Sequence, residues 1–171
     1  MNYAGIIHYD IANGVGIRES LFVSGCRNNC PGCFNKDQQD FNYGNEFSEK
    51  VMNDLLEHLS EPHCKGLTIL GGDPMEPENA AGLIPLINAF KKLKEEGKDL
   101  WVYTGYLYEN LIALPFGDPR KKLLLNTDVL VDGPFVLEKK DVRLKFRGSS
   151  NQRVIDVQKS IGSDKIIKYL E

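Results

Sequence analysis

Four short apolar segments, three of them closed by a glycine-containing turn, constrain the fold of this chain more than any other feature. The segments span residues 17–24, 67–70, 100–103 and 129–131. The last three end at Gly71-Gly72, Thr104-Gly105 and Asp132-Gly133-Pro134, and the first leads into a loop with three cysteines. Short apolar runs bounded by such turns are typical of buried strands. The pattern therefore predicts four strands with loops at their carboxyl ends.

Amphipathic helices are predicted between these strands. Ser48 is a suitable N-cap for a helix whose apolar residues recur over residues 51–59. A second helix is expected over residues 77–94, and Gly97 stands where that helix would stop. A short third helix is expected over residues 108–114. Strands that alternate with helices in this way are typical of parallel β/α units.

The length of the chain limits how many such units it can hold. A closed barrel of eight β/α units takes about 250 residues, and this chain has 171. We therefore predict an α/β fold of the incomplete barrel type, with a curved, mostly parallel sheet and helices on its outer side. One domain is expected over residues 1–171, with an extra strand at 153–157. Residues 158–171 form a tail to which the sequence assigns no role.

Charge and the amino-terminal residues narrow the class of function. Lys and Arg number 21 against 24 Asp and Glu, a formal net charge of −3, so nothing favours nucleic-acid or membrane-surface binding. There is no run of about 18 apolar residues for a bilayer span, and the amino terminus lacks the basic segment of a secretory signal. We therefore expect a cytoplasmic protein. In that reducing compartment, clustered cysteines bind metals or act in redox chemistry more often than they form disulfides.

Three closely spaced cysteines carry the strongest chemical signal. Cys26, Cys30 and Cys33 are separated by three and by two residues, so one short loop presents three thiolates. Iron–sulfur clusters are held by thiolates clustered in this way. A 4Fe–4S cube has four irons, and three ligands leave one iron without a protein thiolate. Because an open coordination position is where a metal site does chemistry, we expect these residues to hold a reactive cluster.

Three other interpretations of the cysteines remain open. A structural zinc site needs a fourth ligand, and only Cys64 and three histidines are left to supply one. A disulfide with a spare thiol is uncommon in a reducing compartment. An electron-transfer ferredoxin normally has a fourth clustered cysteine. We interpret Cys64 as a structural or incidental thiol. Arg18 and Arg147 are interpreted as ordinary surface arginines, the alternatives being that they face a partner or bind a carboxylate.

Several blocks of the sequence resemble one protein family. The spacing Cys26-x3-Cys30-x2-Cys33 is similar to the signature of the radical S-adenosylmethionine superfamily, although the aromatic residue follows the last cysteine, at Phe34, instead of preceding it. Within that superfamily the chain resembles the activating proteins of anaerobic ribonucleoside-triphosphate reductase. The blocks that carry this resemblance are NGVGIR (13–18), LFVSGC (21–26), CPGCFN (30–35), GGDP (71–74), TGY (104–106), VLVDGPF (129–135) and RGSSNQRVI (147–155).

The predicted strand ends and the resemblance together indicate where S-adenosylmethionine would bind. Ligands of parallel β/α folds bind at the carboxyl ends of the strands. Gly71 and Gly72 would let the main chain approach the ligand, and the resemblance implies that Asp73 meets the methionine amino group. The alternative is that this segment is only a turn. By resemblance, further contacts are expected from Gly32, Cys33 and Phe34, and Thr104 and Asp132 are candidates because they lie at the ends of predicted strands.

Some of these residues have a second interpretation. Thr104 and Asp132 are equally suited to ending a strand, and Phe34 or Tyr103 is expected either to stack on the adenine or to join the core. The chemistry needs only some of them, because the cluster and S-adenosylmethionine carry the reaction themselves. The residues that contact the ligand therefore remain a prediction.

The resemblance implies an enzyme that cleaves S-adenosylmethionine reductively at a 4Fe–4S cluster. The 5′-deoxyadenosyl radical would take a hydrogen atom from a glycine of the large catalytic subunit of the reductase, and an electron-donor protein such as flavodoxin would supply the electron. A half barrel would leave one side open to a loop of that partner. The alternatives are an activating enzyme of another glycyl-radical protein such as pyruvate formate-lyase, a radical enzyme with a peptide or small-molecule substrate, and a non-enzymatic zinc or iron–sulfur module.

Overall fold

One sheet of eight strands organises the computed structural model, which describes residues 1–171. The strands are β1 (Asn2–Asp10), β2 (Arg18–Val23), β3 (Asn45–Glu46), β4 (Gly66–Gly71), β5 (Asp99–Tyr103), β6 (Val129–Asp132), β7 (Arg153–Asp156) and β8 (Lys168–Leu170). Their order across the sheet is β3-β1-β2-β4-β5-β6-β7-β8. The sheet is open, because β3 and β8 form its two edges and do not pair with each other.

The four central strands are those predicted from the apolar segments. Strands β2, β4, β5 and β6 are parallel neighbours, with Leu21 opposite Ile69, Ile69 opposite Val102, and Val102 opposite Leu130. Their carboxyl ends therefore meet at one edge of the sheet, as predicted. The extra strand expected near residue 153 is confirmed as β7. The curvature of a partial barrel stays a prediction.

Both sides of this parallel centre carry antiparallel strands, of which the sequence predicted only β7. Strand β1 pairs antiparallel with β2, and β7 pairs antiparallel with β6 and with β8. No strand was predicted before residue 17, so β1 is new. Strand β1 is exposed over residues 7–9 and is interrupted by bulge-like shifts of register, so its pattern lacks the clear alternation of a half-buried strand.

Five α-helices and two short 3₁₀ helices join the strands. They are α1 (Glu49–Leu59), α2 (Pro77–Glu95), α3 (Tyr108–Ile112), α4 (Pro119–Leu125), α5 (Val157–Ser163), η1 (Lys36–Gln39) and η2 (Leu137–Lys139). The predicted N-cap is confirmed, since the Ser48 hydroxyl accepts a hydrogen bond from the Val51 N–H at 3.3 Å. Helices α4 and α5 were not predicted, because each is only seven residues long and too short for a clear helical period.

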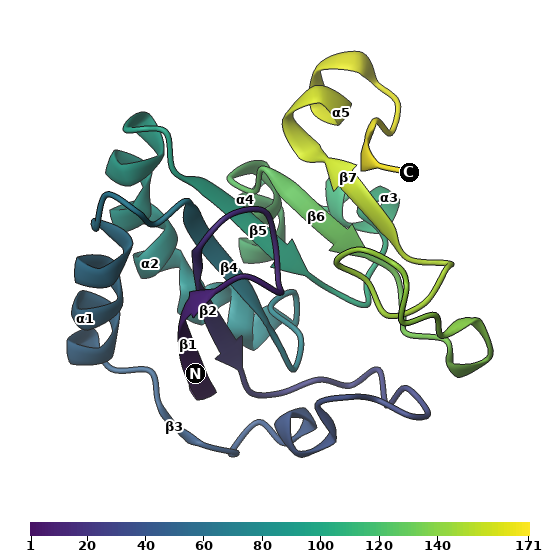
Figure 1. The fold of residues 1–171 in the computed structure, drawn as a ribbon, viewed down its shortest axis with the longest axis horizontal. Coiled ribbons are helices and arrows are strands. Elements are labelled where there is room, and N and C mark those ends of the chain that lie inside the picture. Colours follow the sequence, from purple (N-terminus) through teal and green to yellow (C-terminus); the bar gives the residue numbers. More distant parts are fainter.

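The helices and the loops cover opposite faces of the sheet. Figure 1 shows α2, α3 and α4 behind the sheet, whereas the β1–β2 connection crosses its front. The larger apolar core lies on the helix side and includes Leu55, Phe90 and Leu123. A smaller cluster around Trp101 lies on the other face. None of the helices combines the length and the apolar composition that a bilayer crossing needs.

Arg18 corrects the prediction of a surface arginine. It is fully buried on the face that carries Trp101, with its guanidinium 5.4 Å from the centre of the Trp101 ring. It donates hydrogen bonds to the Thr68 hydroxyl at 2.7 Å and to the Leu67 carbonyl at 3.0 Å, and it pairs with the Asp99 carboxylate at 2.7 Å. A buried charge is tolerated when its donors are satisfied in this way. Arg18 is therefore a structural residue at the centre of the sheet.

Candidate functional site

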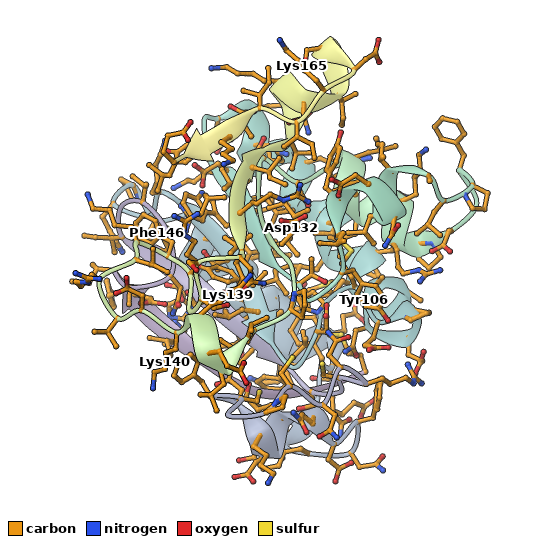
Figure 2. All side chains as sticks on the ribbon, turned by 90° about the vertical axis from the view of Figure 1, so that its right-hand side faces the viewer. Tyr106, Asp132, Lys139, Lys140, Phe146 and Lys165 are labelled. Atoms are coloured by element: carbon orange, nitrogen blue, oxygen red, sulfur yellow. The ribbon has the colours of Figure 1, made fainter.

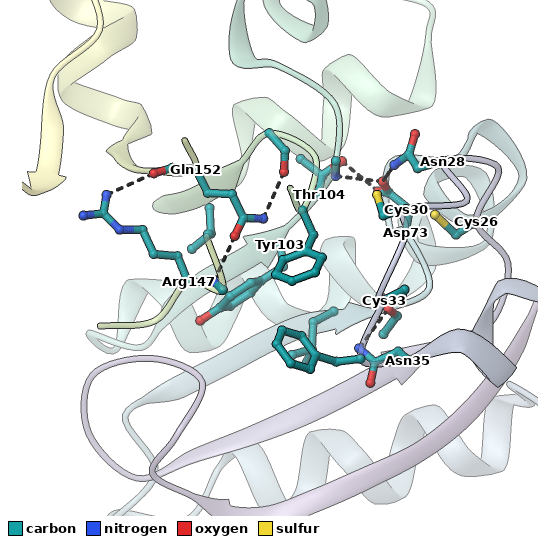
Figure 3. A pocket seen from close by; sticks show the side chains of 18 of the residues that line it. Cys26, Asn28, Cys30, Cys33, Asn35, Asp73, Tyr103, Thr104, Arg147 and Gln152 are labelled. Carbon is teal, nitrogen blue, oxygen red and sulfur yellow. Dashed lines mark hydrogen bonds between the residues drawn. The ribbon is translucent and has the colours of Figure 1, made fainter. Parts of the chain in front are cut away.

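One pocket at the carboxyl ends of the parallel strands contains most of the predicted site residues. Its volume is about 560 Å³, and its walls come from the cysteine loop (residues 24–35), the ends of β4, β5 and β6, and the β6–β7 connection, which we call the 133–152 segment. Figure 3 shows the three cysteines on one side of this pocket and Arg147 and Gln152 on the other. The predicted site residues that line it are Cys26, Cys30, Cys33, Phe34, Gly71, Gly72, Asp73 and Thr104.

The three motif cysteines border the pocket as free thiols. All are partly exposed and none forms a disulfide. The Cys33 N–H donates to the Cys30 carbonyl at 3.1 Å, which closes a turn around Gly32, where φ is +72°. Gly32 does not line the pocket itself, so its conformation serves this turn. Burial raises the pKa of the Cys26 thiol to about 12, and the Asp73 and Glu76 carboxylates also raise it.

The chemistry of these donors fits a 4Fe–4S cluster. Soft thiolates are the ligands that select iron–sulfur clusters, and three unpaired thiols border one cavity. No group of three Cys, His, Asp or Glu side chains is close enough to share a single metal ion. In a cube each ligated iron is a separate corner, so the thiolates have to reach the same cavity and not the same point. Cys64, in contrast, is buried in the larger core and donates to the Gly66 carbonyl at 3.4 Å.

Asp73 is the centre of the hydrogen-bond network beside the cysteines. Its side chain is 1% exposed. One carboxylate oxygen accepts from the Met75 N–H at 2.9 Å and the Thr104 hydroxyl at 2.7 Å. The other accepts from the Gly105 N–H at 2.9 Å and the Asn28 amide at 3.1 Å. Burial raises the pKa of Asp73 to about 6, although the hydrogen bonds from Gly105, Thr104 and Met75 lower it. Asp73 therefore ties the cysteine loop to the ends of β4 and β5.

Two of the three asparagines of the cysteine loop, Asn28 and Asn35, were not predicted as site residues, yet both contact the β4 end. Asn28 donates to Asp73, as described, and the Asn35 amide donates to the Gly71 carbonyl at 3.3 Å. Both also line the pocket, and Figure 3 shows their hydrogen bonds as dashed lines. The only signal in the sequence is their position beside the cysteines, where short polar side chains can hold main chain in loop conformations.

Gly71 and Gly72 allow two main-chain segments to approach each other. At Gly71 φ is +107°, which favours glycine. A Cβ atom on Gly72 would stand 2.6 Å from the Gly25 carbonyl oxygen and 2.7 Å from the Gln38 carbonyl oxygen. The sequence analysis attributed these glycines to contact with a ligand, and both do line the pocket. The steric requirement at Gly72, however, comes from the main chain that leads into and out of the cysteine loop.

Asp132 is oriented away from the pocket. It is fully buried and does not line the cavity. Its carboxylate accepts hydrogen bonds from the Tyr108 N–H at 2.8 Å and from the Arg153 guanidinium at 2.5 and 2.9 Å. Figure 2 shows Asp132 apart from Lys140 and Phe146, which belong to the pocket wall. Of the two interpretations given for Asp132, this geometry matches the structural one, because the side chain fastens β6 to α3 and β7.

Aromatic side chains form the apolar part of the pocket wall. Phe34 is 64% exposed, and its ring lies 5.0 Å from that of Phe135, with the Lys140 ammonium 5.2 Å from the ring centre. Tyr103 lies on β5, and its buried hydroxyl has no hydrogen-bond partner. Burial raises the pKa of Tyr103. A buried polar group without a partner is uncommon in proteins, so the Tyr103 hydroxyl is an exception in this structure.

The RGSSNQR block folds the 133–152 segment back onto the sheet. The Gln152 amide oxygen accepts from the Gly148 and Ser149 N–H groups at 2.9 and 3.1 Å, and its nitrogen donates to the Gly133 carbonyl at 3.0 Å. Arg147 donates to the Gln152 carbonyl at 3.0 Å and lines the pocket. The prediction that Arg147 is an ordinary surface arginine was therefore wrong, because the segment encloses part of its side chain.

Comparison with known proteins agrees with this site. A family model described as a 4Fe-4S single cluster domain matches residues 12–155. The anaerobic ribonucleoside-triphosphate reductase-activating protein of Pasteurella multocida (strain Pm70) is 44% identical over 156 residues, which cover 89% of this chain and 95% of that protein. The proteins of the same name from Escherichia coli (strain K12) and Enterobacteria phage T4 are 39% and 36% identical and cover 90% of this chain; the matches span 97% and 93% of those proteins. The chain belongs to this family.

Membership confirms the resemblance on which the sequence analysis relied. The region matched by the 4Fe-4S single cluster domain model, residues 12–155, includes the cysteine loop and all seven sequence blocks that carried the resemblance. It also supports an iron–sulfur cluster as the cofactor of this chain. The 133–152 segment lies within the same region, so its pocket wall belongs to the family domain.

Proposed function

We propose that this protein holds a 4Fe–4S cluster through Cys26, Cys30 and Cys33 and cleaves S-adenosylmethionine reductively, so that a glycyl radical forms on the large catalytic subunit of anaerobic ribonucleoside-triphosphate reductase. The strongest support is the arrangement of three free thiols and the Gly71–Asp73 turn around one pocket. The names of the relatives supply the partner. The protein is then a radical S-adenosylmethionine oxidoreductase of the cytoplasm.

The cluster supplies the electron chemistry, and the chain supplies orientation. A reduced cluster would supply one electron to the sulfonium of S-adenosylmethionine, so that the S–C5′ bond would break to methionine and a 5′-deoxyadenosyl radical, which would take a hydrogen atom from the glycine Cα and become 5′-deoxyadenosine. Cys26, Cys30 and Cys33 would hold the cluster as thiolates, and the methionine amino and carboxylate groups would bind where the chain supplies no thiolate. A fixed geometry of this kind matters because small displacements of reacting atoms slow a reaction strongly.

The β4 end and the aromatic wall are the proposed contacts for S-adenosylmethionine. Gly71 and Gly72 bring main chain to the pocket, and Asp73 accepts a hydrogen bond from the methionine amino group. Because the Asp73 carboxylate already accepts four hydrogen bonds, an N–H of the methionine amino group would replace one donor, and the hydrogen bond from the Asn28 amide, at 3.1 Å, is the longest of the four. Phe34 and Tyr103 are proposed to border the adenosine, and Thr104 to orient Asp73.

The 133–152 segment is proposed to shield the radical from water and to border the entry of the partner. It contributes Phe135, Lys140 and Phe146 to the pocket wall, while Val142 is 89% exposed at the surface. A primary carbon radical reacts with most nearby C–H bonds, so the open side has to be covered during the reaction. The glycine loop of the reductase is the proposed cover, and an electron-donor protein such as flavodoxin supplies the electron.

One anaerobic experiment tests this proposal. Reconstituted protein is mixed with S-adenosylmethionine, a chemical reductant and the large reductase subunit. We expect 5′-deoxyadenosine formation to rise when the subunit is added, together with a glycyl radical signal by electron paramagnetic resonance. A subunit whose radical glycine is changed to alanine should give no such signal. Full cleavage without the subunit, or the absence of a radical with it, would favour a peptide or small-molecule substrate.

A second measurement separates the remaining alternatives. Iron and zinc contents after anaerobic purification distinguish an iron–sulfur enzyme from a zinc module, and we expect about four irons per chain. Replacing the reductase subunit by pyruvate formate-lyase tests the other glycyl-radical partner. A radical signal on pyruvate formate-lyase that equals the signal on the reductase would contradict the proposed specificity.

A further inference from the structure

The residues between Cys26 and Cys30 are attached to the turn between β4 and α2. The Arg27 N–H donates to one oxygen of the Glu76 carboxylate at 2.9 Å, and the Arg27 guanidinium donates to the other oxygen. Asn28, the next residue, donates to Asp73. Two consecutive residues of the spacer therefore bind two buried carboxylates of the same turn. The position of Cys26 depends on these bonds, since it directly precedes them in the chain.

Glu76 is unusual among the charged residues of this structure. It is 0% exposed and stands at the N-cap position of α2, yet its side chain makes no capping hydrogen bond. An N-cap side chain normally accepts a hydrogen bond from its own helix. Here both carboxylate oxygens bind Arg27 instead. Burial of a carboxylate is unfavourable unless it is paired and hydrogen-bonded, so the contact with Arg27 accounts for the position of Glu76.

The guanidinium of Arg27 has further partners at the surface. It pairs with the Glu78 carboxylate, and it lies 4.5 Å from the centre of the Phe41 ring. Arg27 and Glu78 are 56% and 51% exposed, whereas Glu76 is buried. An exposed pair of this kind contributes little to stability. Glu78 is therefore a natural control: it has the same charge and the same partner, but not the burial or the main-chain hydrogen bond.

We propose that Glu76 is a positioning residue, which fixes the Arg27 main chain and thereby holds Cys26 in the geometry that the cluster requires. The inference rests on the proposed ligand role of Cys26. Partners behind the ligands of a metal site orient those ligands, and their loss commonly lowers metal affinity about tenfold or more. The hydrogen bond from the Arg27 N–H performs this task without touching the metal.

The pair also places two opposite charges beside the cluster site. Reduction adds a negative charge to the cluster, and nearby charges shift its reduction potential. Glu76→Gln removes a negative charge while its amide oxygen still accepts the Arg27 N–H. Arg27→Gln removes a positive charge and leaves that N–H in place. We therefore expect the potential to rise in Glu76→Gln and to fall in Arg27→Gln, with iron binding retained in both.

The first experiment uses the protein without its cluster. Hydrogen–deuterium exchange of the amides of residues 26–30 is measured in the wild-type protein, Glu76→Ala, Glu76→Gln and Glu78→Ala. Loss of one buried hydrogen bond should speed exchange of the Arg27 amide in Glu76→Ala on the order of tenfold. Glu76→Gln should restore slow exchange, and Glu78→Ala should match the wild type. Equal exchange in Glu76→Ala and Glu78→Ala would overturn the proposal.

The second experiment uses the reconstituted cluster. Iron release to a chelator should be about tenfold faster in Glu76→Ala than in Glu78→Ala, and a redox titration followed by electron paramagnetic resonance should give shifts of opposite sign for Glu76→Gln and Arg27→Gln. Shifts of the same sign, or no difference in iron release, would contradict the positioning role. If Glu76→Ala does not fold, Glu76→Gln and Arg27→Gln still decide by their potentials. A wild-type protein that binds no cluster would refute the proposed function, whereas the exchange experiment would still test the Glu76 contact.

Discussion

Asp73 and Asp132 occupy equivalent places in the chain and have different surroundings in the fold. Each follows or ends a parallel strand, and their side chains are 1% and 0% exposed. Asp73 accepts hydrogen bonds from the cysteine loop and from the end of β5 and lines the pocket. Asp132 accepts from α3 and from Arg153 on β7 and does not line the pocket.

This difference separates two sides of the site. On the β4 side, meaning the cysteine loop with residues 71–73, buried polar groups connect the loops that border the pocket. On the β6 side, meaning residues 132–133 with Arg153, they connect elements of the framework. Residues at the ends of parallel strands lie at the same edge of the sheet. Whether such a residue can contact a ligand depends on the direction in which its side chain points. Substitutions on the two sides should therefore affect different measurements.

The largest difference is expected for the cysteines. Changing any one of Cys26, Cys30 or Cys33 to alanine should abolish the cluster after anaerobic reconstitution, because only two thiolates would remain to bind the cube. Cys64→Ala should retain about four irons per chain, since Cys64 lies in the apolar core. Iron analysis with visible absorption checks both. A Cys64 variant without a cluster, beside a motif variant that keeps one, would show that the ligands were assigned wrongly.

Exchanging the two aspartates for asparagine tests the comparison directly. Asp132→Asn removes the negative charge beside Arg153, which keeps its second partner Glu109, so we expect a loss of about 2 kcal/mol of unfolding free energy, the size of a hydrogen bond to a charged group. Its affinity for S-adenosylmethionine should stay near the wild-type value. Asp73→Asn should lower that affinity about tenfold, because hydrogen bonds to a charged group are the stronger ones. Denaturant titration and equilibrium dialysis measure the two effects, and equal changes in both variants would remove the distinction between the sides.

Substitution of Gly72 and of Gly133 by alanine forms a matched pair with expected effects of equal or smaller size. In Gly72→Ala the added Cβ would meet the Gly25 carbonyl oxygen at 2.6 Å, so the cysteine loop has to shift, and such overpacking costs about 2 kcal/mol. In Gly133→Ala the nearest atom is 3.8 Å away, and only the positive φ of 98° opposes the substitution, at about 1 kcal/mol. Iron retention against a chelator should decrease in Gly72→Ala alone. Decreased retention in Gly133→Ala would place the β6 side in contact with the cluster loop.

Much of the fold could be predicted from local patterns in the sequence. The strands that could not be predicted lack such a pattern, for physical reasons. The parallel strands are buried on both faces, so β4 is a short continuous apolar run that the sequence reveals. Strand β1 is partly exposed and irregular, and β8 has only three residues. Their pairing depends on neighbours that are distant in the sequence, and no local pattern specifies it.

The candidate site was predictable where one residue type has one chemical use. Three clustered cysteines indicate a metal cofactor from spacing alone, whereas an arginine, an asparagine or a glutamate has many uses. Arg18 is bonded to Asp99, 81 positions away in the chain, and Glu76 is bonded to Arg27, 49 positions away. The sequence carried no sign of either contact. The reason for Gly72 was also missed, because the atoms that crowd it belong to the cysteine loop and become neighbours only through the fold.

Tyr103 lies on β5, between the two sides. Its substitution should change the unfolding free energy least, but in a direction that is clearly defined. Its buried hydroxyl has no partner, and an unsatisfied buried group is unfavourable by about 1 kcal/mol. Tyr103→Phe should therefore raise the unfolding free energy of the ligand-free protein by about that amount. If the hydroxyl binds S-adenosylmethionine, the same variant should bind it several-fold more weakly. Tyr43→Phe is the control, because Tyr43 is 41% exposed and does not line the pocket. Thermal unfolding with and without the ligand separates the outcomes: a stabilised variant with unchanged affinity would assign Tyr103 to the framework with Asp132, whereas weaker binding would assign it to the pocket with Asp73.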